Sequence, residues 1–193
     1  MATASLPTIR LPGTSLIPVQ GFSATELMVA LAIIASLAAL AAPGFGGIVE
    51  RYRLLRATQD LSESIYLARS EAIRRGGRVT LRKTSPAGCA TGRNKDWSCG
   101  WAVFADTNDN GTRDAGEEEI RTSPIPEGVE TTLRAGGSGA YLKVDRWGQL
   151  NGLGAFSIVL RPRNNPDPEA ARTLCVTAGG RLKSLQGTDA CQR

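Results

Sequence analysis

One stretch of the sequence, Gly21–Val49, limits what this chain can fold into more than any other. Its only charge is at Glu26, and residues 27–49 are uncharged and rich in Ala, Leu and Ile. About 20 apolar residues suffice to cross the hydrocarbon core of a bilayer. A carboxylate at the start of such a segment is costly unless it has a partner, so an acid there points to function. The stretch therefore predicts a transmembrane helix over residues 22–49.

The residues before this stretch differ from an ordinary export signal. A secretory signal has a basic start, an apolar centre of about 7–15 residues and a small-residue cleavage site after that centre. Here a polar leader, residues 1–21, ends at Gly21 before the apolar run, and its only basic residue is Arg10. Cleavage after the leader would leave the apolar run on the mature protein.

The segment GFSATELMVALAII resembles the class III signal of type IV pilins and of type II secretion pseudopilins. This resemblance implies that a prepilin peptidase cleaves between Gly21 and Phe22 and methylates the new amino terminus. It also implies that Glu26 pairs with the terminal amine of a neighbouring subunit during assembly. The leader departs from the pattern, because most prepilins have Lys or Arg close before the glycine. An ordinary single-pass anchor with a chance acid is the alternative.

Composition argues against an enzyme. The chain has 193 residues and a net charge of +5, which allows one modest domain beside the apolar segment. It has no histidine, the commonest general base and metal ligand. Strained-nucleophile, P-loop and dinucleotide-binding motifs are also missing from the sequence. We therefore expect no catalytic residues and no cofactor, with calcium, considered below, as the one exception.

Four cysteines, Cys89, Cys99, Cys175 and Cys191, follow this export-type segment. An even number in such a context predicts two disulfides in an oxidising compartment. Three pairings are open to four cysteines. The order along the chain favours Cys89–Cys99 and Cys175–Cys191.

Residues 50–76 are predicted to continue the apolar segment as an amphipathic helix. Gly76 and Gly77 predict its end, because glycine readily takes the left-handed conformation of a helix terminus. Pro43 and the glycines behind it predict a break or bend upstream, and many pilins that this chain resembles also have a proline there. One apolar stripe follows from spacings of three and four: Leu54, Thr58, Leu61, Ile65, Ala68 and Ala72.

Beyond residue 77 the pattern changes to short alternating runs, separated by clusters of Gly, Pro, Asn and Asp. Many short strands predict antiparallel sheets packed on the long helix. The expected fold is α+β, a type IV pilin-like fold whose β-rich globular head is residues 77–193. The predicted strands are Arg78–Lys83, Gly100–Ala105, Glu119–Thr122, Val129–Leu133, Ala140–Asp145, Phe156–Arg161, Arg172–Thr177 and Arg181–Leu185.

A second resemblance narrows the family. The segment IYLARSEAIRRGGRVTL, Ile65–Leu81, resembles the helix end and first strand of the GspH/FimT branch of minor pilins and pseudopilins. Together with the amino-terminal signal, the resemblance touches most of the chain.

Charge is unevenly distributed. Arg51–Lys95 holds eleven basic and three acidic residues, whereas Asp106–Glu130 holds eight acidic and two basic residues. Basic residues next to an apolar segment can attract anionic lipid or another polyanion. A solvated helix face is the alternative.

The acidic part contains the sequence DTNDNGTRDAGE, which fits the calcium-loop pattern D-x-[DN]-x-[DN]-G-x5-E. Oxygen side chains on alternate residues can surround a hard cation while Gly111 permits the turn. A hairpin turn needs Asn and Asp without any metal, and the preceding Trp101–Phe104 resembles a strand rather than an EF-hand helix. Both interpretations stay open. The calcium ligands would be Asp106, Asn108, Asn110, Thr112, Asp114 and Glu117.

Near the carboxyl end, Gly180-Arg181-Leu182-Lys183 resembles the GRxR motif through which some FimT-type pilins contact DNA. Arg181 and Lys183 stand two apart, so a strand would project both from one face. Arg172, Arg161 and Arg163 could support such contacts. Lys183 replaces the motif's second arginine, which keeps the charge but loses the guanidinium fork. A glycine-containing turn with exposed basic residues is the alternative.

These observations predict a minor pilin, held in the bacterial inner membrane by one span with a periplasmic head and later built into an extracellular type IV pilus. Its expected partners are other pilins, the prepilin peptidase, the inner membrane and, as a further hypothesis, DNA during natural transformation. The alternative function is a GspH-like minor pseudopilin of a type II secretion system.

Overall fold

The computed structural model describes residues 21–41, 45–89, 92–134, 139–151, 154–177, 180–188 and 191. The chain divides into two compact units, Met1–Pro43 and Gly44–Arg193, and each is described by itself. The leader residues 1–20 and the predicted bend at Pro43 lie outside the described residues.

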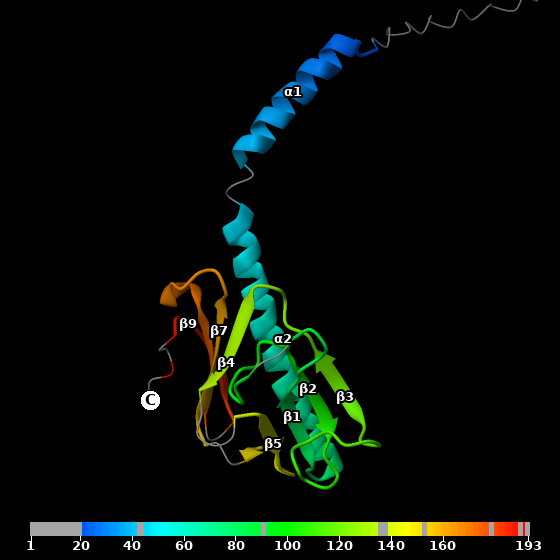
Figure 1. Cartoon of the computed structure of the whole chain (residues 1–193), viewed down its shortest axis with the longest axis vertical. Coiled ribbons are helices and arrows are strands. Elements are labelled where there is room, and N and C mark those ends of the chain that lie inside the picture. The colour runs from blue at the N-terminus through cyan, green and yellow to red at the C-terminus, as the bar shows by residue number, and fades with distance from the viewer. Residues whose placement is uncertain are drawn as a thin grey trace, which may run out of the picture. The chain divides into compact units, whose positions relative to one another are not determined.

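In the first unit, helix α1 spans Ala24–Ala41 (Figure 1). The Ser23 hydroxyl accepts a hydrogen bond from the backbone N–H of Glu26 at 3.2 Å, as an N-cap residue does. The described part of α1 exposes its apolar side chains on every face, among them Met28, Leu31 and Ile34. No helix among the described residues combines the length and the apolar character that a membrane crossing requires.

The second unit is built on helix α2, Phe45–Arg75. Every residue of the predicted stripe is buried, from Leu54 at 3% exposure to Ala72 at 0%. The helix ends as predicted, because Gly76 and Gly77 have φ of 75° and 105°. The N–H of Gly77 donates to the carbonyl of Ala72 at 2.7 Å, which satisfies one of the last helical acceptors.

Among the described residues, nine antiparallel strands form two sheets that both contact α2 (Figure 1). Eight of them match the predicted runs; β6 is an unpredicted two-residue strand that pairs with the end of β5. The first sheet has the order β3-β2-β1-β5-β6, with β1 Val79–Lys83, β2 Trp101–Ala105, β3 Glu119–Ser123, β5 Tyr141–Val144 and β6 Leu150–Asn151. The second has the order β4-β7-β8-β9, with β4 Val129–Arg134, β7 Phe156–Pro162, β8 Arg172–Val176 and β9 Leu182–Gln186. A 3-10 turn, Pro168–Ala170, precedes β8.

The hydrophobic core lies within the second unit, where the stripe of α2 packs against inward residues of both sheets. Its largest side chains include Trp97, Trp101 and Phe104, each at 0% exposure. The disulfides Cys89–Cys99 and Cys175–Cys191 form, in the pairing that sequence order favours. The second unit therefore has a complete core of its own.

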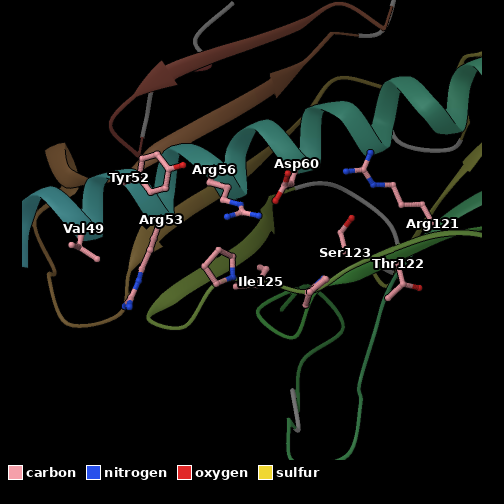
Figure 2. Close-up of a pocket in the computed structure, with 11 residues that line it drawn as sticks. Val49, Tyr52, Arg53, Arg56, Asp60, Arg121, Thr122, Ser123 and Ile125 are labelled. Carbon is pink, nitrogen blue, oxygen red and sulfur yellow. The ribbon is translucent and has the colours of Figure 1, made fainter.

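The first turns of α2 are less covered. They border an open groove of about 590 Å³, whose other side is the end of β3 and the loop that follows it (Figure 2). We call this the α2–β3 groove. Its lining residues are Val49, Tyr52, Arg53, Arg56, Asp60 and residues 121–126.

Candidate functional site

The predicted processing residues lie at the start of α1. Gly21 has open space where a Cβ would stand, and the Phe22 side chain is 79% exposed. Glu26 lies in the first turn of α1, directly above the Ser23 cap. A negative side chain is favourable there because the amino end of a helix carries partial positive charge. Gly21, Phe22 and Glu26 thus lie within five residues of the expected cleavage point.

Arg69, from the ARSEAI segment of α2, joins two distant turns. Its Nε donates to the carbonyl of Gly148, between β5 and β6, at 2.7 Å. Its Nη1 donates to the carbonyl of Gly180, between β8 and β9, at 2.5 Å. One guanidinium on the central helix therefore fixes one hairpin tip from each sheet. The sequence motif around Arg69 and the motif around Gly180 are parts of the same contact.

This contact explains the glycine at position 180. Gly180 has a φ of 77°, a left-handed conformation that side chains rarely adopt. A Cβ there would also lie 2.8 Å from Nη2 of Arg69. Both the backbone conformation and the close approach of the guanidinium therefore require glycine.

The turn held by Arg69 leads into β9 and so positions the two predicted DNA-contacting residues, Arg181 in the turn and Lys183 in the strand. Its backbone is closed by Thr177 and Arg181, since the Thr177 N–H donates to the Arg181 carbonyl and the Thr177 hydroxyl accepts from the Arg181 N–H, both at 3.1 Å. Arg181 and Lys183 line one hollow of about 510 Å³. Arg134 from β4 lines it as well and donates to the carbonyl of Thr188 at 3.1 Å. Three cations from two strands and a turn therefore border this hollow.

The rest of that hollow is apolar. Phe156, Val176 and Leu185 line it, together with the Cys175–Cys191 disulfide. Cys175 stands opposite Lys183 in the β8–β9 register, so the disulfide attaches the end of the chain beside the lysine. The hollow can accept an anionic group next to a nonpolar surface.

The three arginines that were predicted to support these contacts, Arg161, Arg163 and Arg172, do not line this hollow. Arg161 stands opposite Glu130 in the β4–β7 register and forms an ion pair with it at 2.8 Å. Arg163 also approaches Glu130, at 3.6 Å. Arg172 lines a separate hollow beside Glu169 and Arg51. Support of Arg181 and Lys183 by these three arginines stays a prediction.

The last turn of α2 carries an ionic cluster that the sequence reasoning missed. Glu71 accepts hydrogen bonds from Nη2 of Arg74 at 2.5 Å and from Nε of Arg75 at 2.8 Å. The Arg74 and Arg75 guanidinium groups lower the pKa of Glu71 to about 2. Arg75 also forms an ion pair with Glu118 at 2.8 Å, which connects the helix end to the acidic loop.

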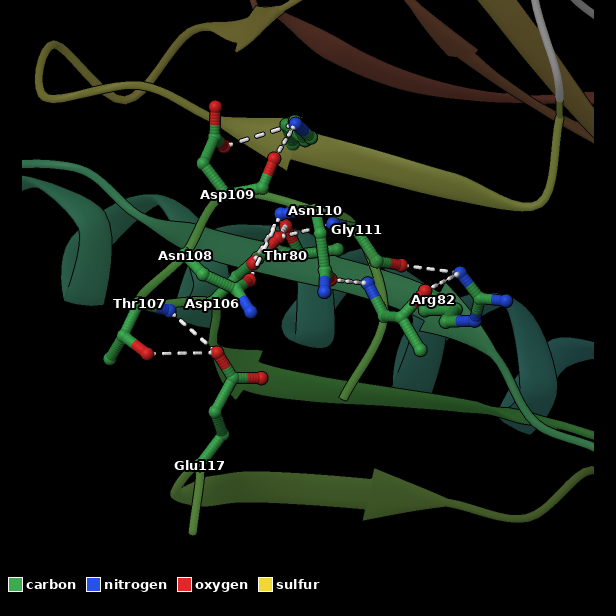
Figure 3. A network of polar contacts seen from close by, with 11 residues as sticks. Thr80, Arg82, Asp106, Thr107, Asn108, Asp109, Asn110, Gly111 and Glu117 are labelled. Atoms are coloured by element: carbon green, nitrogen blue, oxygen red, sulfur yellow. Dashed lines mark hydrogen bonds and ion pairs between the residues drawn. The ribbon is translucent and has the colours of Figure 1, made fainter. Parts of the chain in front are cut away.

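The acidic loop is closed by its own hydrogen bonds (Figure 3). Asp106 has 0% exposure, and its carboxylate accepts from the N–H groups of Asn110 and Gly111 and from the Thr80 hydroxyl, at 2.7–2.9 Å. Glu117 accepts from the N–H of Thr107 at 2.8 Å and from the N–H of Asp114 at 3.0 Å. The pKa of Glu117 is lowered, and the hydrogen bond from the Asp114 backbone is the main cause.

The remaining predicted calcium ligands also contact one another. The side-chain amides of Asn108 and Asn110 donate to the Asp114 carboxylate, each at 2.7 Å. The Asn110 side-chain oxygen accepts from the Thr112 N–H at 2.6 Å. Within the described residues, no group of three or more His, Cys, Asp or Glu side chains is arranged to hold a metal ion. Calcium binding by this loop stays a prediction.

The sequence matches a family described as type II transport protein GspH over residues 57–180. The chain belongs to the GspH family. The matched segment begins in α2 and ends at Gly180, so it contains both partners of the Arg69 contact. Among curated proteins, none matches this GspH-family chain significantly.

The chain is also similar to solved structures, among them those of two bacterial proteins. The type IV minor pilin FimU of Pseudomonas aeruginosa PAO1 matches with a TM-score of 0.53 and 18% identity, over 75% of this chain and 99% of FimU. A second crystal form of FimU gives 0.52 and 17%, over 72% and 100%. The minor pseudopilin EpsH of the Vibrio cholerae type 2 secretion system gives 0.48 and 16%, over 69% and 97%. The likeness to FimU confirms the predicted α+β, type IV pilin-like fold.

Sequence reasoning found this GspH-family segment but not the roles of its residues. It quoted ARSEAI as a motif, yet assigned nothing to Arg69 or Glu71, and it did not connect Arg134 with Arg181. A charged residue at the border of the apolar stripe was the available signal, because Arg69 directly follows Ala68, a residue of that stripe. Its partners could not be found, since they are backbone carbonyls far along the chain.

We predict that Arg69 and Gly180 act as one unit. Arg69→Ala should lower the free energy of unfolding by about 3 kcal/mol, because two hydrogen bonds from a charged group are lost. Gly180→Ala should destabilise through its φ and through the clash with Arg69, so the two changes together should cost less than their sum. Urea unfolding of the second unit with its disulfides intact measures all three variants.

Gly187→Ala is the matched control for that cycle. Gly187 also has a left-handed φ, 92°, but nothing lies within 4 Å of its added Cβ. Its cost should be the same with and without Arg69. Strict additivity of Arg69→Ala and Gly180→Ala would contradict the contact.

The Glu71 cluster predicts a pH dependence. The folded pKa is about 2 against an ordinary 4.5, so the stabilisation is fully present above pH 4.5 and is lost as the pH falls toward 2. Glu71→Gln should therefore be less stable than the parent at neutral pH and equal to it near pH 2. Glu63→Gln is the control, because its ion pair with Arg121 is longer, at 3.4 Å, and exposed. A constant difference between Glu71→Gln and the parent across this range would refute the assignment.

Proposed function

We propose that this chain is a minor subunit of a type IV pilus, incorporated into the filament and supporting its assembly. The apolar surface of α1 is the observation that carries the proposal. A helix that is apolar on every face needs cover from other protein or from lipid, and the described side chains of α1 are exposed, for example Met28 at 72%. Membership of the GspH family and the fold shared with FimU support the same conclusion.

In this proposal, the prepilin peptidase cleaves between Gly21 and Phe22 and methylates the new amino terminus. The mature chain waits in the inner membrane with its head in the periplasm, and α1 then packs among the helices of other pilins. Glu26 neutralises the terminal amine of a neighbour. The role is structural, because the chain contributes surfaces and a helix rather than reacting groups.

A minor pseudopilin of a type II secretion system is the alternative, and it uses the same assembly chemistry. The family description, type II transport protein GspH, favours it to a similar degree. Deletion of the gene, followed by separate measurement of twitching and of protein secretion, distinguishes the two roles.

DNA binding is a second candidate function, favoured by the hollow that Arg181 and Lys183 share with Arg134. Contacts from such cations to phosphates would be independent of sequence and sensitive to salt. This function is compatible with a place in a pilus, since a filament subunit can present the hollow to DNA outside the cell.

For assembly, we predict that Glu26→Val leaves the second unit folded but reduces recovery of the chain in sheared filaments. The residue lies outside the unit that contains the core and both disulfides, so only the pairing with a neighbour's amine is lost. Glu50→Val, one helix further along, is the control and should be recovered like the parent. Equal recovery of Glu26→Val and the parent would contradict the role.

For DNA, the purified second unit should bind duplexes of different sequence almost equally. Its affinity should fall by about 0.9 log unit per log unit of salt for each neutralised phosphate. Arg181→Ala with Lys183→Ala should weaken binding and reduce the salt slope by up to about two. Arg161→Ala with Arg163→Ala removes the same charge beside Glu130 and should change little. Equal effects of the two pairs, or no binding at low salt, would rule out this DNA site.

A further inference from the structure

One side of the α2–β3 groove is apolar, and we call this side its floor. Pro124, Ile125 and Pro126 form one side of it, and Ile125 also packs against the core. Val49 and Tyr52 from α2 are 44% and 64% exposed at one end. Large exposed side chains that gather in a hollow are typical of an interaction surface.

The charged residues of the groove are mostly basic. Arg53, Arg56 and Arg121 stand against one acid, Asp60 (Figure 2). Figure 2 shows Arg53 and Arg56 projecting from α2 on the side of the loop that carries Ile125. The groove therefore has an excess of two positive charges and complements an acidic partner.

These guanidinium groups are weakly engaged within the chain. Within the described residues, the side chain of Arg56 makes no hydrogen bond or ion pair. Arg121 reaches Glu63 only at 3.4 Å, between exposed side chains, and such a pair contributes little. Arg53 donates to the carbonyl of Glu127 at 3.4 Å, which is a long hydrogen bond. All three can accept a new partner at small cost.

Strand β3 is at the edge of its sheet, and no described strand pairs with its outer side. An edge strand offers unpaired backbone groups to an extended chain. Pro124 and Pro126, just beyond β3, have no N–H to donate, so an added strand would be held there by side chains. The groove follows α2 for about 16 Å from Val49 to Asp60, a length that about five extended residues cover.

We propose that the α2–β3 groove is the docking site for an extended acidic segment of a neighbouring filament subunit, with apolar side chains between its acids. The inference rests on the proposed function, because a filament supplies that neighbour. In a strand, alternate side chains face the same way, so acids on one side could meet the arginines while apolar residues lie on the Pro-Ile-Pro floor.

An anionic membrane surface fits the groove less well. Lipid headgroups would satisfy Arg53 and Arg56 but would leave the edge of β3 unused. An extended peptide uses the cations, the apolar floor and the strand edge together. The test therefore includes vesicles as a competing ligand.

The first experiment uses the second unit and a short labelled peptide of alternating glutamate and valine, with a lysine–valine peptide as control. Fluorescence anisotropy should show binding of the glutamate peptide alone. Arg56→Glu with Arg121→Glu should weaken that binding by at least about tenfold. Arg93→Glu with Arg146→Glu makes the same charge change at exposed positions outside the groove and should have little effect.

Equal weakening by both double variants would overturn the proposal, because it would show only a general charge effect. Absence of glutamate-peptide binding would also overturn it. So would binding to phosphatidylglycerol vesicles that depends on Arg56 and Arg121 when the peptide does not bind.

The second experiment places a photo-crosslinking amino acid at Thr122, an exposed groove residue, in the full chain in cells. A crosslink in sheared filaments, mapped to an acidic segment of another pilin or pseudopilin, supports the proposal. Incorporated chain whose crosslinks map elsewhere overturns the groove proposal but leaves the filament role intact. Failure of the parent chain to enter filaments instead contradicts the proposed function, while the peptide measurement still decides the groove's chemistry.

Discussion

The packing of the α2 stripe against both sheets is the interaction on which the second unit depends. Leu61, Ile65 and Ala68 are fully buried along it. Once this stripe faces the core, the orientation of α2 about its own axis is fixed, because successive side chains are separated by a constant angle around that axis. Arg69 is then directed to the hairpin tips, and Arg56 is left on the open groove. The packing of the core therefore determines which polar residues of α2 reach the surface and where they lie.

The two units differ in whether their apolar side chains are buried. The second unit encloses its own core and closes its charged loops by hydrogen bonds, as the buried Asp106 carboxylate illustrates. The described side chains of α1 are instead exposed, for example Leu31 at 64%. In the proposed role, this difference lets the head fold before assembly and leaves the apolar surface of α1 to drive association with other subunits.

Much of the fold could be predicted, because local patterns determine it. Spacings of three and four located the buried face of α2, and the Gly76–Gly77 pair located its end. Alternating runs found eight strands. The two-residue β6 escaped, since Leu150–Asn151 depends on pairing with β5 and has no pattern of its own.

The site was less predictable, because its residues also come together through strand pairing rather than through a local sequence pattern. Arg181 and Lys183 line one hollow, and Arg134 joins them through the β4–β7–β8–β9 order, which no local pattern reveals. Arg161 was expected nearby and instead pairs with Glu130 across β4 and β7. The calcium-like spacing from Asp106 to Glu117 describes a loop whose oxygens bind its own N–H groups, a role that the same residues can fill without metal.

The central claim is that other subunits cover α1 in a filament, and thiol accessibility tests it directly. Both native pairs are disulfides and no free cysteine is present among the described residues, so an introduced cysteine gives a distinct thiol. Leu31→Cys reports on α1, and Ala115→Cys reports on an exposed loop of the head. In sheared filaments treated with a water-soluble maleimide, the Leu31→Cys thiol should stay unlabelled after the Ala115→Cys thiol has reacted fully, and denaturation should make both reactive. Equal labelling of the two thiols in intact filaments would contradict the account.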